Sequence, residues 1–263
     1  MKLVFFTDSH ISTATPLLRK DNFYETLKNK FHEIQQIIEK ENVDYVLHGG
    51  DWFDRPDISL AVAREFTVII QSFGRPVYTV AGNHDVFAHN SPSAGRTMLE
   101  LLGEMGVMKI LGNEDVVVLE KDKIKLQLTG RPYSSEIDGK NFKRYYLVKK
   151  QKGVDYAVNI VHGMLLDRPI ENVRFTLIDD IQDTEADITL SGHYHTGFGT
   201  IKIRSKYFIN PGSIVRITGY LSEVVRRPQV AVIELSDRVT VNVVELSSAL
   251  PGTDVLNMEG FLH

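Results

Sequence analysis

The chain opens with the ten residues MKLVFFTDSH, in which an apolar run leads directly into an aspartate and a histidine. Residues 3–7 are rich in the β-branched and aromatic types that favour strands, so we expect a strand that ends at Asp8. Asp8 and His10 would then lie on the loop at the strand end, where rigidly held functional groups usually occur. The opening stretch therefore predicts a sheet that presents polar ligands at its strand ends.

Four further motifs follow the same plan, because each comes after a short apolar run. In chain order they are Gly50-Asp51, Gly82-Asn83-His84-Asp85, His162-Gly163 and Gly192-His193-Tyr194-His195. A glycine in each motif suits the tight turns and close backbone approaches of a strand end. Together the five motifs predict one site that is built from several strand ends.

Between these motifs, the hydrophobic spacing alternates between helix and strand. Helices are expected over residues 22–41, 59–73 and 91–103, with Gly103 as the stop of the third. This start predicts parallel strands joined by right-handed crossovers. After Gly103 strands predominate, with one helix expected within 142–151. Further strands are expected at residues 116–119, 124–129, 156–161, 188–190, 199–203, 207–209, 230–235 and 239–246.

We therefore expect an α/β fold of two mixed β-sheets packed face to face, with helices outside. A chain of 263 residues with 43% hydrophobic content can bury a large core. We expect one domain over residues 1–250, followed by a loose C-terminal tail over residues 251–263.

The composition also limits the possible partners and compartments. The net charge of −4 gives no global attraction to nucleic acid or anionic lipid, and the lack of cysteine excludes disulfides and thiolate metal sites. The opening apolar run is too short for a signal peptide, and no apolar segment is long enough to span a membrane. We expect a cytoplasmic protein without a membrane partner.

The polar residues of the five motifs form a mixed nitrogen and oxygen ligand set. The carboxylate of Asp51 can bridge two ions because it has two oxygens. Such a set suits Mn²⁺, Fe²⁺ or Zn²⁺ better than Mg²⁺ or Ca²⁺, which prefer oxygen ligands alone. We expect two divalent ions, foremost Mn²⁺, which would attract phosphate and acidify a bridging water. The candidate ligands are Asp8, His10, Asp51, Asn83, His162, His193 and His195.

His84 is not needed as a ligand if Asn83 fills that role. It can then act as the general acid that protonates the leaving oxygen, while Asp85 holds its other ring nitrogen. Arg216 and Arg131 are candidates for contact with the substrate phosphate, because each flanks an expected active-site loop.

These motifs resemble the pattern of the metallophosphoesterase, or calcineurin-like phosphoesterase, superfamily, which is D-x-H, G-D, G-N-H-D/E, H and G-H-x-H. The resemblance covers residues 2–246. It implies a four-layer α-β-β-α sandwich and makes His84 the catalytic histidine. It also implies that one metal is held by Asp8, His10, Asp51 and His195, and the other by Asp51, Asn83, His162 and His193.

A narrower resemblance is to the SbcD-type nuclease subunit of DNA double-strand-break repair complexes. It rests on GDWFD at 50–54, AGNHD at 81–85, HGML at 162–165 and NPGS at 210–213. It implies DNA as substrate, a homodimer formed through helices beside the 82–85 loop, and an SMC-like ATPase partner. Those nucleases carry a further DNA-capping domain and an ATPase-docking segment, and this chain ends soon after His195. We therefore expect DNA more strongly than the ATPase.

The expected function is a dinuclear metal-dependent phosphodiesterase, foremost a DNA exo- or endonuclease of the repair type. By the resemblance, a metal-bridging hydroxide attacks phosphorus in line and His84 serves the leaving group. One alternative is a phosphodiesterase or phosphatase for a small molecule, such as a cyclic nucleotide or a nucleotide-linked lipid, which would show a walled pocket instead of an open groove. The other is a non-catalytic scaffold without bound metal.

Overall fold

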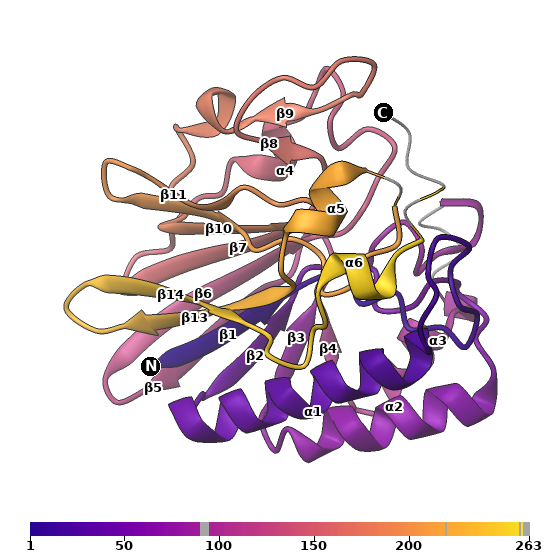
Figure 1. Cartoon of the computed structure of the whole chain (residues 1–263). Helices are drawn as coiled ribbons and strands as arrows, with labels where there is room; N and C mark the ends of the chain where they lie inside the picture. Colours follow the sequence, from indigo (N-terminus) through magenta and orange to yellow (C-terminus); the bar gives the residue numbers. More distant parts are fainter. Residues whose placement is uncertain (90–94, 219, 258, 260–263) are drawn as a thin grey trace.

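The opening strand, β1 (Lys2–Phe6), lies inside the first of two sheets. It pairs in parallel with β2 (Tyr45–His48) on one side and antiparallel with β13 (Gln229–Leu235) on the other. Residues 2–6 and residues 229–235, far apart in the sequence, therefore lie side by side in one sheet (Figure 1). This computed structural model describes residues 1–89, 95–218, 220–257 and 259.

The first sheet has six strands in the order β14-β13-β1-β2-β3-β4. Strands β1 to β4 run parallel, as the expected crossovers require, while β13 and β14 form an antiparallel pair at one side. The sheet is thus mixed. Its remaining strands are β3 (Val77–Thr79), β4 (Lys109–Ile110) and β14 (Val239–Glu245).

The second sheet also has six strands, in the order β11-β12-β10-β7-β6-β5. Its four central strands are parallel, and the antiparallel strands β5 and β11 form its edges. A small parallel pair, β8 (Leu165–Leu166) and β9 (Thr176–Leu177), lies outside both sheets. The strands of the second sheet are β5 (Val116–Lys121), β6 (Ile124–Arg131), β7 (Tyr156–His162), β10 (Ile188–Gly192), β11 (Gly199–Ile203) and β12 (Lys206–Asn210).

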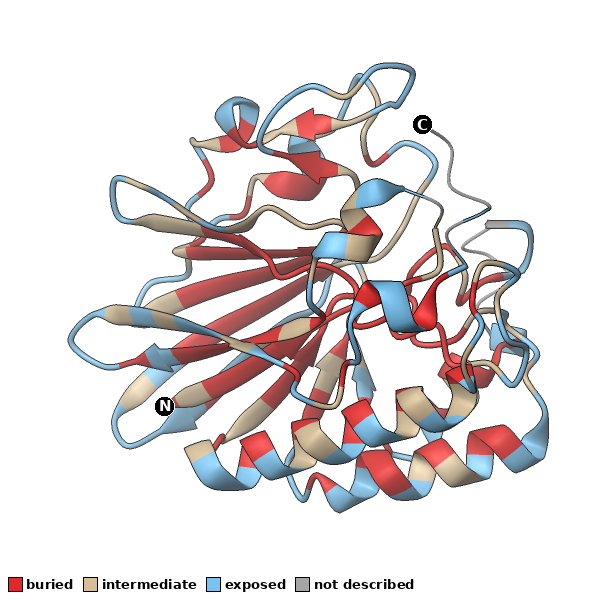
Figure 2. Ribbon diagram, in the orientation of Figure 1, coloured by how far each residue is buried: buried red, intermediate tan, exposed pale blue. Residues whose placement is uncertain are grey.

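The two sheets pack face to face because successive side chains of a strand point to opposite faces. Leu3 and Phe5 of β1 enter the core between the sheets, where they join Leu128 of β6. Val4 and Phe6 point the other way and join the core beneath the helices. Figure 2 shows the central strands buried along most of their length.

Helices α1 (Phe23–Glu41) and α2 (Leu60–Ser72) cover the outer face of the first sheet (Figure 1). Each begins at a side chain that satisfies a free backbone N–H: Asn22 accepts from Glu25 N, and Ser59 accepts from Val62 N. Both helices were expected at these positions, and both expectations are confirmed.

The outer face of the second sheet has a thinner cover. It consists of the short helix α4 (Lys143–Tyr146) and a 3₁₀ turn (Ile178–Ile181), whose side chains pack on Phe208 of β12. The expected four-layer α-β-β-α sandwich is confirmed, with a slender fourth layer. The remaining helices are α3 (Met98–Glu104), α5 (Leu221–Val225) and α6 (Gly252–Val255).

Two expectations about segment ends are wrong. Helix α3 begins after Thr97, whose side chain accepts from Glu100 N, and it continues to Glu104, so Gly103 lies inside the helix. A Cβ at Gly103 would lie 2.7 Å from Ile110 Cδ1, so close packing on β4 explains this glycine better than a helix stop. Residues 91–94 of the expected helix lie outside the described residues.

The second concerns the expected loose tail over residues 251–263, whose first residues are packed. Helix α6 follows Pro251, and Val255 and Leu256 are buried, with 2% and 0% of their surface exposed. Leu256 also forms a β-bridge with Arg19. The first part of the expected tail is therefore packed onto the body of the protein, whereas residues 258 and 260–263 lie outside the described residues.

The sequence left open whether the apolar residues of α2 and α3 pack on the sheet or form a dimer interface. Phe66 and Ile69 are buried in the core, so the apolar residues of this kind pack inside the protein and are not available for a dimer interface. Val68 and Leu101 remain exposed, at 59% and 47% of their surface.

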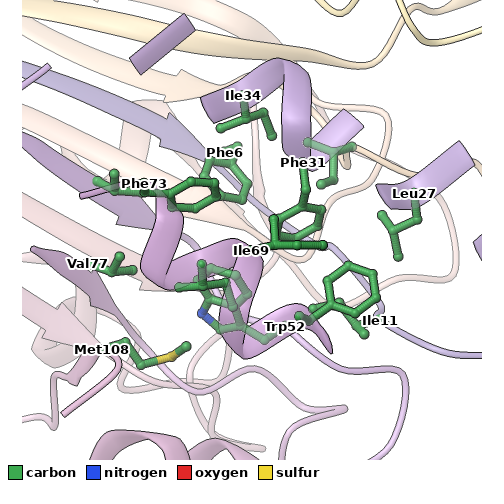
Figure 3. Packing of buried hydrophobic residues seen from close by; sticks show 14 of the residues in the cluster. Phe6, Ile11, Leu27, Phe31, Ile34, Trp52, Ile69, Phe73, Val77 and Met108 are labelled. Atoms are coloured by element: carbon green, nitrogen blue, oxygen red, sulfur yellow. The ribbon is translucent and has the colours of Figure 1, made fainter. Parts of the chain in front are cut away.

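The aromatic cluster beneath α1 gives a test of the fold (Figure 3). Phe31 is fully buried and its ring contacts those of Phe6, Phe66 and Phe73 at centroid distances of 6.0, 5.2 and 6.3 Å. We expect Phe31→Ala to lower the free energy of unfolding by about 3–5 kcal/mol, because it leaves a cavity. The control Val68→Ala should change it by less than about 0.5 kcal/mol. Urea unfolding measures both, and a loss below about 1 kcal/mol for Phe31→Ala would contradict this packing.

Candidate active site and metal centre

The candidate ligands lie where strand ends of both sheets meet. In the first sheet, Asp8 follows β1, Asp51 follows β2 and Asn83 follows β3. In the second sheet, His162 ends β7 and His193 follows β10. The structure therefore brings together in space the motifs that lie far apart in the sequence.

Four of these residues form a first ligand group. Asp8, His10, Asp51 and His195 each offer a ligand atom, and these atoms all lie within 4.8 Å of one another. His10 Nε2 lies 3.1 Å from His195 Nε2 and 3.7 Å from Asp51 Oδ2, and His195 Nε2 lies 3.6 Å from Asp8 Oδ1. This is the set that the resemblance assigned to one ion.

A second group shares Asp51 with the first. Asp51, His162 and His193 have ligand atoms within 4.8 Å of one another. His162 Nε2 lies 3.4 Å from Asp51 Oδ2 and 3.1 Å from Asn83 Oδ1, which adds the amide oxygen to this group. Asp51 therefore belongs to both groups, and its bridging of two ions stays a prediction.

The arrangement fits divalent cations. His162 Nδ1 donates to the carbonyl oxygen of Gly49 at 2.7 Å, so Nε2 of the neutral ring carries a lone pair toward Asp51 and Asn83. Acceptor atoms that face one another in this way require a cation or a proton between them. Neighbouring ligand atoms lie 3.1 to 3.7 Å apart. Ligands that bind one ion at about 2.0–2.2 Å would lie roughly 2.8–3.6 Å apart.

The buried carboxylates create a field that favours positive charge. Burial, followed by the charge of Asp51, raises the pKa of Asp85 to about 7. Burial lowers the pKa of His162, but the charge and hydrogen bond of Asp51, the charge of Asp8 and the carbonyl of Gly49 together outweigh it and raise that pKa to about 9. The negative charge around Asp51 thus favours a bound proton, and it would favour divalent ions for the same reason.

The ligand loops depend on an uncommon backbone conformation. Asp8, His10, Asp51 and His193 all have positive φ angles, between 42° and 73°. Residues other than glycine rarely adopt this left-handed region, and such residues gather at functional sites where the surrounding structure holds them. Backbone bonds hold these loops, among them Asp8 N to Gly50 O at 3.1 Å and His10 N to Asp51 O at 3.0 Å.

Gly82 shows why a glycine precedes the ligand Asn83. A Cβ at Gly82 would lie 2.0 Å from Asp51 Oδ1 and 2.4 Å from Asp51 N. Any larger residue would therefore displace the bridging carboxylate. The absence of a side chain lets the third strand's loop approach the second strand's loop closely.

Asp85 has a different role from the one expected. Its carboxylate accepts hydrogen bonds from the backbone N–H groups of Asp51, Gly82 and Phe53 at 2.9, 2.8 and 3.1 Å. It does not hold the ring of His84. Asp85 instead links the loop of Asp51 to the loop of Gly82. The sequence could not predict this role, because it depends on where three backbone N–H groups lie in the fold.

Asp54 takes the role that was expected of Asp85. His84 Nδ1 donates to the main-chain carbonyl oxygen of Asp54 at 3.0 Å, which orients the ring. The carboxylate of Asp54 lies 3.7 Å from His10 Nδ1. The rings of His10 and His84 meet edge to face at 4.7 Å. One loop residue thus supports both a candidate ligand and the candidate catalytic histidine.

The two arginines expected to bind phosphate differ in outcome. Arg216 is buried, and its guanidinium donates to the carbonyl oxygens of Arg226 and Leu250, both at 2.6 Å. These contacts give Arg216 a structural role and overturn the expectation of phosphate contact. Arg131 donates to the carbonyl oxygens of Asn113 and Gly130 at 2.8 and 2.7 Å, and its phosphate contact stays a prediction.

Behind the first ligand group, cations bind four consecutive carbonyl oxygens of residues 213–216. We call the donors Arg19, Lys30 and Arg226 the cation clamp. Ser213 links this loop to the site, because its hydroxyl donates to the carbonyl oxygen of Asp8 at 2.7 Å and its N–H donates to that of His195 at 2.9 Å. The pairs are Arg226 with Ser213 and Val215, Lys30 with Ile214, and Arg19 with Arg216.

Sequence reasoning did not single out two residues of this site. Thr7 Oγ1 donates to Asp8 Oδ2 at 2.6 Å, and the ring of Tyr133 lies 5.7 Å from that of His193. Both positions come at or just after a strand end, which is the signal that could have indicated them. The buried His48 shares a hydrogen bond with Ser9 Oγ at 2.8 Å, so it serves as a hydrogen-bonded core residue beside the site.

Comparison with known proteins agrees with the fold and the ligand set. A family model described as calcineurin-like phosphoesterase matches residues 1–197. The chain therefore belongs to the calcineurin-like phosphoesterase family.

Two curated proteins show a more distant similarity. Double-strand break repair protein mre-11 of Caenorhabditis elegans is 24% identical over 49% of this chain and 23% of that protein. DNA double-strand break repair protein Mre11 of Thermoplasma acidophilum is 32% identical over 34% of this chain and 24% of that protein. The chain thus spans about a quarter of the length of these relatives.

Among solved structures, GAP50 of Plasmodium, described as the anchor in the inner membrane complex, has a TM-score of 0.57. It is 14% identical, and the match covers 95% of this chain and 86% of that one. At this identity the likeness concerns the fold alone. Within the part of the chain that the structure describes, no helix has the length and apolarity to cross a membrane.

The shared position of Asp51 leads to a test with metal alone. We expect Asp51→Asn to weaken the binding of both ions at least about 10-fold, because one bridging charge is lost from both ligand groups. Isothermal titration with Mn²⁺ measures the stoichiometry and affinity. The control is Asp57→Asn, whose side chain is 53% exposed beside Arg55. A variant that still binds two ions as tightly as the natural protein would refute the bridging position.

The cation clamp gives a second prediction. Arg226 pairs with the buried Glu223 at 2.7 Å, so Arg226→Met leaves a buried carboxylate and two carbonyl oxygens without their donor. We expect a loss of about 3–5 kcal/mol in the free energy of unfolding. Arg227→Met is the matched control, because Arg227 is 56% exposed. Equal stability of the two variants in urea unfolding would show that the clamp contributes nothing.

Proposed function

We propose that the protein is a dinuclear metal-dependent phosphodiesterase that cleaves DNA, of the type found in double-strand-break repair. The single observation that carries the two-metal proposal is the pair of ligand groups that share the buried carboxylate of Asp51. Its similarity to the two repair proteins supports DNA as the substrate.

Each residue of the site has a proposed role. Asp8, His10, Asp51 and His195 would hold one divalent ion, foremost Mn²⁺, and Asp51, Asn83, His162 and His193 the other. Such ions, when bound, acidify a water and neutralise charge on the phosphoryl oxygens. His84 lines a cavity together with Asp51, Asn83, His193 and His195. It would donate the proton to the leaving oxygen, with its ring oriented by the Asp54 carbonyl.

The resemblance to repair nucleases extends the proposal to assembly. A homodimer through α2 and α3 has the support of the exposed apolar side chains of Val68 and Leu101. An SMC-like ATPase partner rests on the sequence resemblance alone.

A small phosphodiester is the second candidate substrate. It is favoured by a cavity of about 610 Å³ that adjoins both ligand groups, a volume within the usual range for small-molecule sites. A cleavage assay that uses both kinds of substrate separates the two candidates.

The decisive test is cleavage in the presence of Mn²⁺. End-labelled linear DNA, duplex and single-stranded, is compared with bis-p-nitrophenyl phosphate, and His84→Ala is compared with the natural protein. We expect cleavage of both classes of substrate and a fall in turnover of about 10²–10⁴-fold in the variant, the usual contribution of a general acid.

The exposed His32 on α1 supplies the control variant His32→Ala, which should cleave normally. Cleavage of the small diester alone would leave the metal chemistry in place and remove DNA as the substrate. Normal turnover of His84→Ala on a diester with a poor leaving group would remove His84 from its role.

A further inference from the structure

The cavity beside the ligand groups has one wall of a distinct kind. Its lining includes the polar residues Asp51, His84 and His193. Five other lining residues are apolar or aromatic, and we call them the apolar wall: Met164, Ile170, Val173, Tyr194 and Tyr220.

Four of the five residues of the apolar wall come from segments outside the ligand motifs, and the fifth, Tyr194, lies between His193 and His195. Most of it belongs to residues 164–173, around and after the small strand β8, and Tyr220 stands just before α5. In Figure 1 the pair β8 and β9 and helix α5 lie near the ends of strands β7 and β10 of the second sheet. Side chains of Val173 and Tyr220 are 38% and 66% exposed, so the wall can be reached from solvent.

The charges of the cavity exclude one kind of ligand. Among the described residues that line it, none is lysine or arginine, and Glu171 adds a negative charge at the wall. A groove that follows the backbone of DNA requires cations along several phosphates. The wall is therefore unsuited to a run of phosphates and suited to an uncharged, flat or apolar group next to the one phosphate at the metals.

We propose that the apolar wall binds an unpaired nucleobase attached to the scissile phosphate, an inference that rests on the proposed phosphodiesterase function. Bases stack on aromatic side chains such as Tyr194 and Tyr220. The hydroxyl groups of Thr196 and Ser222, 3.4 Å apart in the same cavity, can hydrogen-bond to a base edge. A base inside a duplex is already stacked and paired, so it must leave the helix to enter this cavity. The preferred substrate is then a single strand or an unpaired end.

Binding can be tested apart from cleavage. His84→Ala in Mn²⁺ is titrated calorimetrically with 5′-dAMP and with deoxyribose 5-phosphate, which lacks the base. We expect dAMP to bind more tightly, and we expect the added change Tyr220→Ala to weaken only dAMP, by about 5- to 150-fold, the measured range for loss of one base–aromatic contact. Tyr220→Phe should restore the affinity. Leu221→Ala is the matched control, because Leu221 is also 66% exposed but does not line the cavity.

Cleavage gives the second readout. With the natural His84, Tyr220→Ala should raise KM for a single-stranded oligonucleotide and leave kcat within about twofold, and it should leave a strand with an abasic residue at the scissile position unchanged. Equal binding of dAMP and deoxyribose 5-phosphate would overturn the base site even if DNA is cut. Base-dependent binding without any cleavage of a phosphodiester would keep the base site and overturn the proposed function.

Discussion

Buried negative charge is the constraint on which the rest of this structure depends. The carboxylates of Asp8, Asp51 and Asp85 lie in the interior, where an uncompensated charge is costly. Each is therefore surrounded by donors, such as His193 N for Asp8 and His84 N for Asp51. One of these donors, His193 N, belongs to a residue with a positive φ angle. What the donors leave uncompensated is the part of the charge that divalent ions would neutralise.

The two sheets contribute different chemistry to this centre. The first sheet supplies both candidate carboxylates, His10 and the amide of Asn83, whereas the other candidate ligands, His162, His193 and His195, all come from the second sheet. Neither sheet alone carries a complete set for one ion. The site therefore exists only when the two sheets are packed together, and metal binding should stabilise that packing by mass action.

Much of the fold and the grouping of the candidate ligands could be predicted, because both depend on local patterns. Apolar runs that end in polar residues marked the strand ends, and helical spacing marked α1 and α2. The roles of Asp85 and Arg216 could not be predicted, since each is determined by backbone groups from distant segments. The packing of α6 was missed for the same reason: Val255 is one apolar residue in a weak pattern, and only its tertiary neighbours bury it.

The cation clamp connects the ligand centre to a part of the chain that carries none of its ligands. Arg226 binds the carbonyl of Ser213, whose hydroxyl braces Asp8, and the neighbouring Arg216 reaches the carbonyl of Leu250. The family match ends at residue 197, just after the last ligand. A fragment cut there would keep every candidate ligand and lose the residues that brace them. The shortest fragment that can hold the candidate ligands in place therefore extends beyond the last motif. Its length is set by the residues that support the ligand loops.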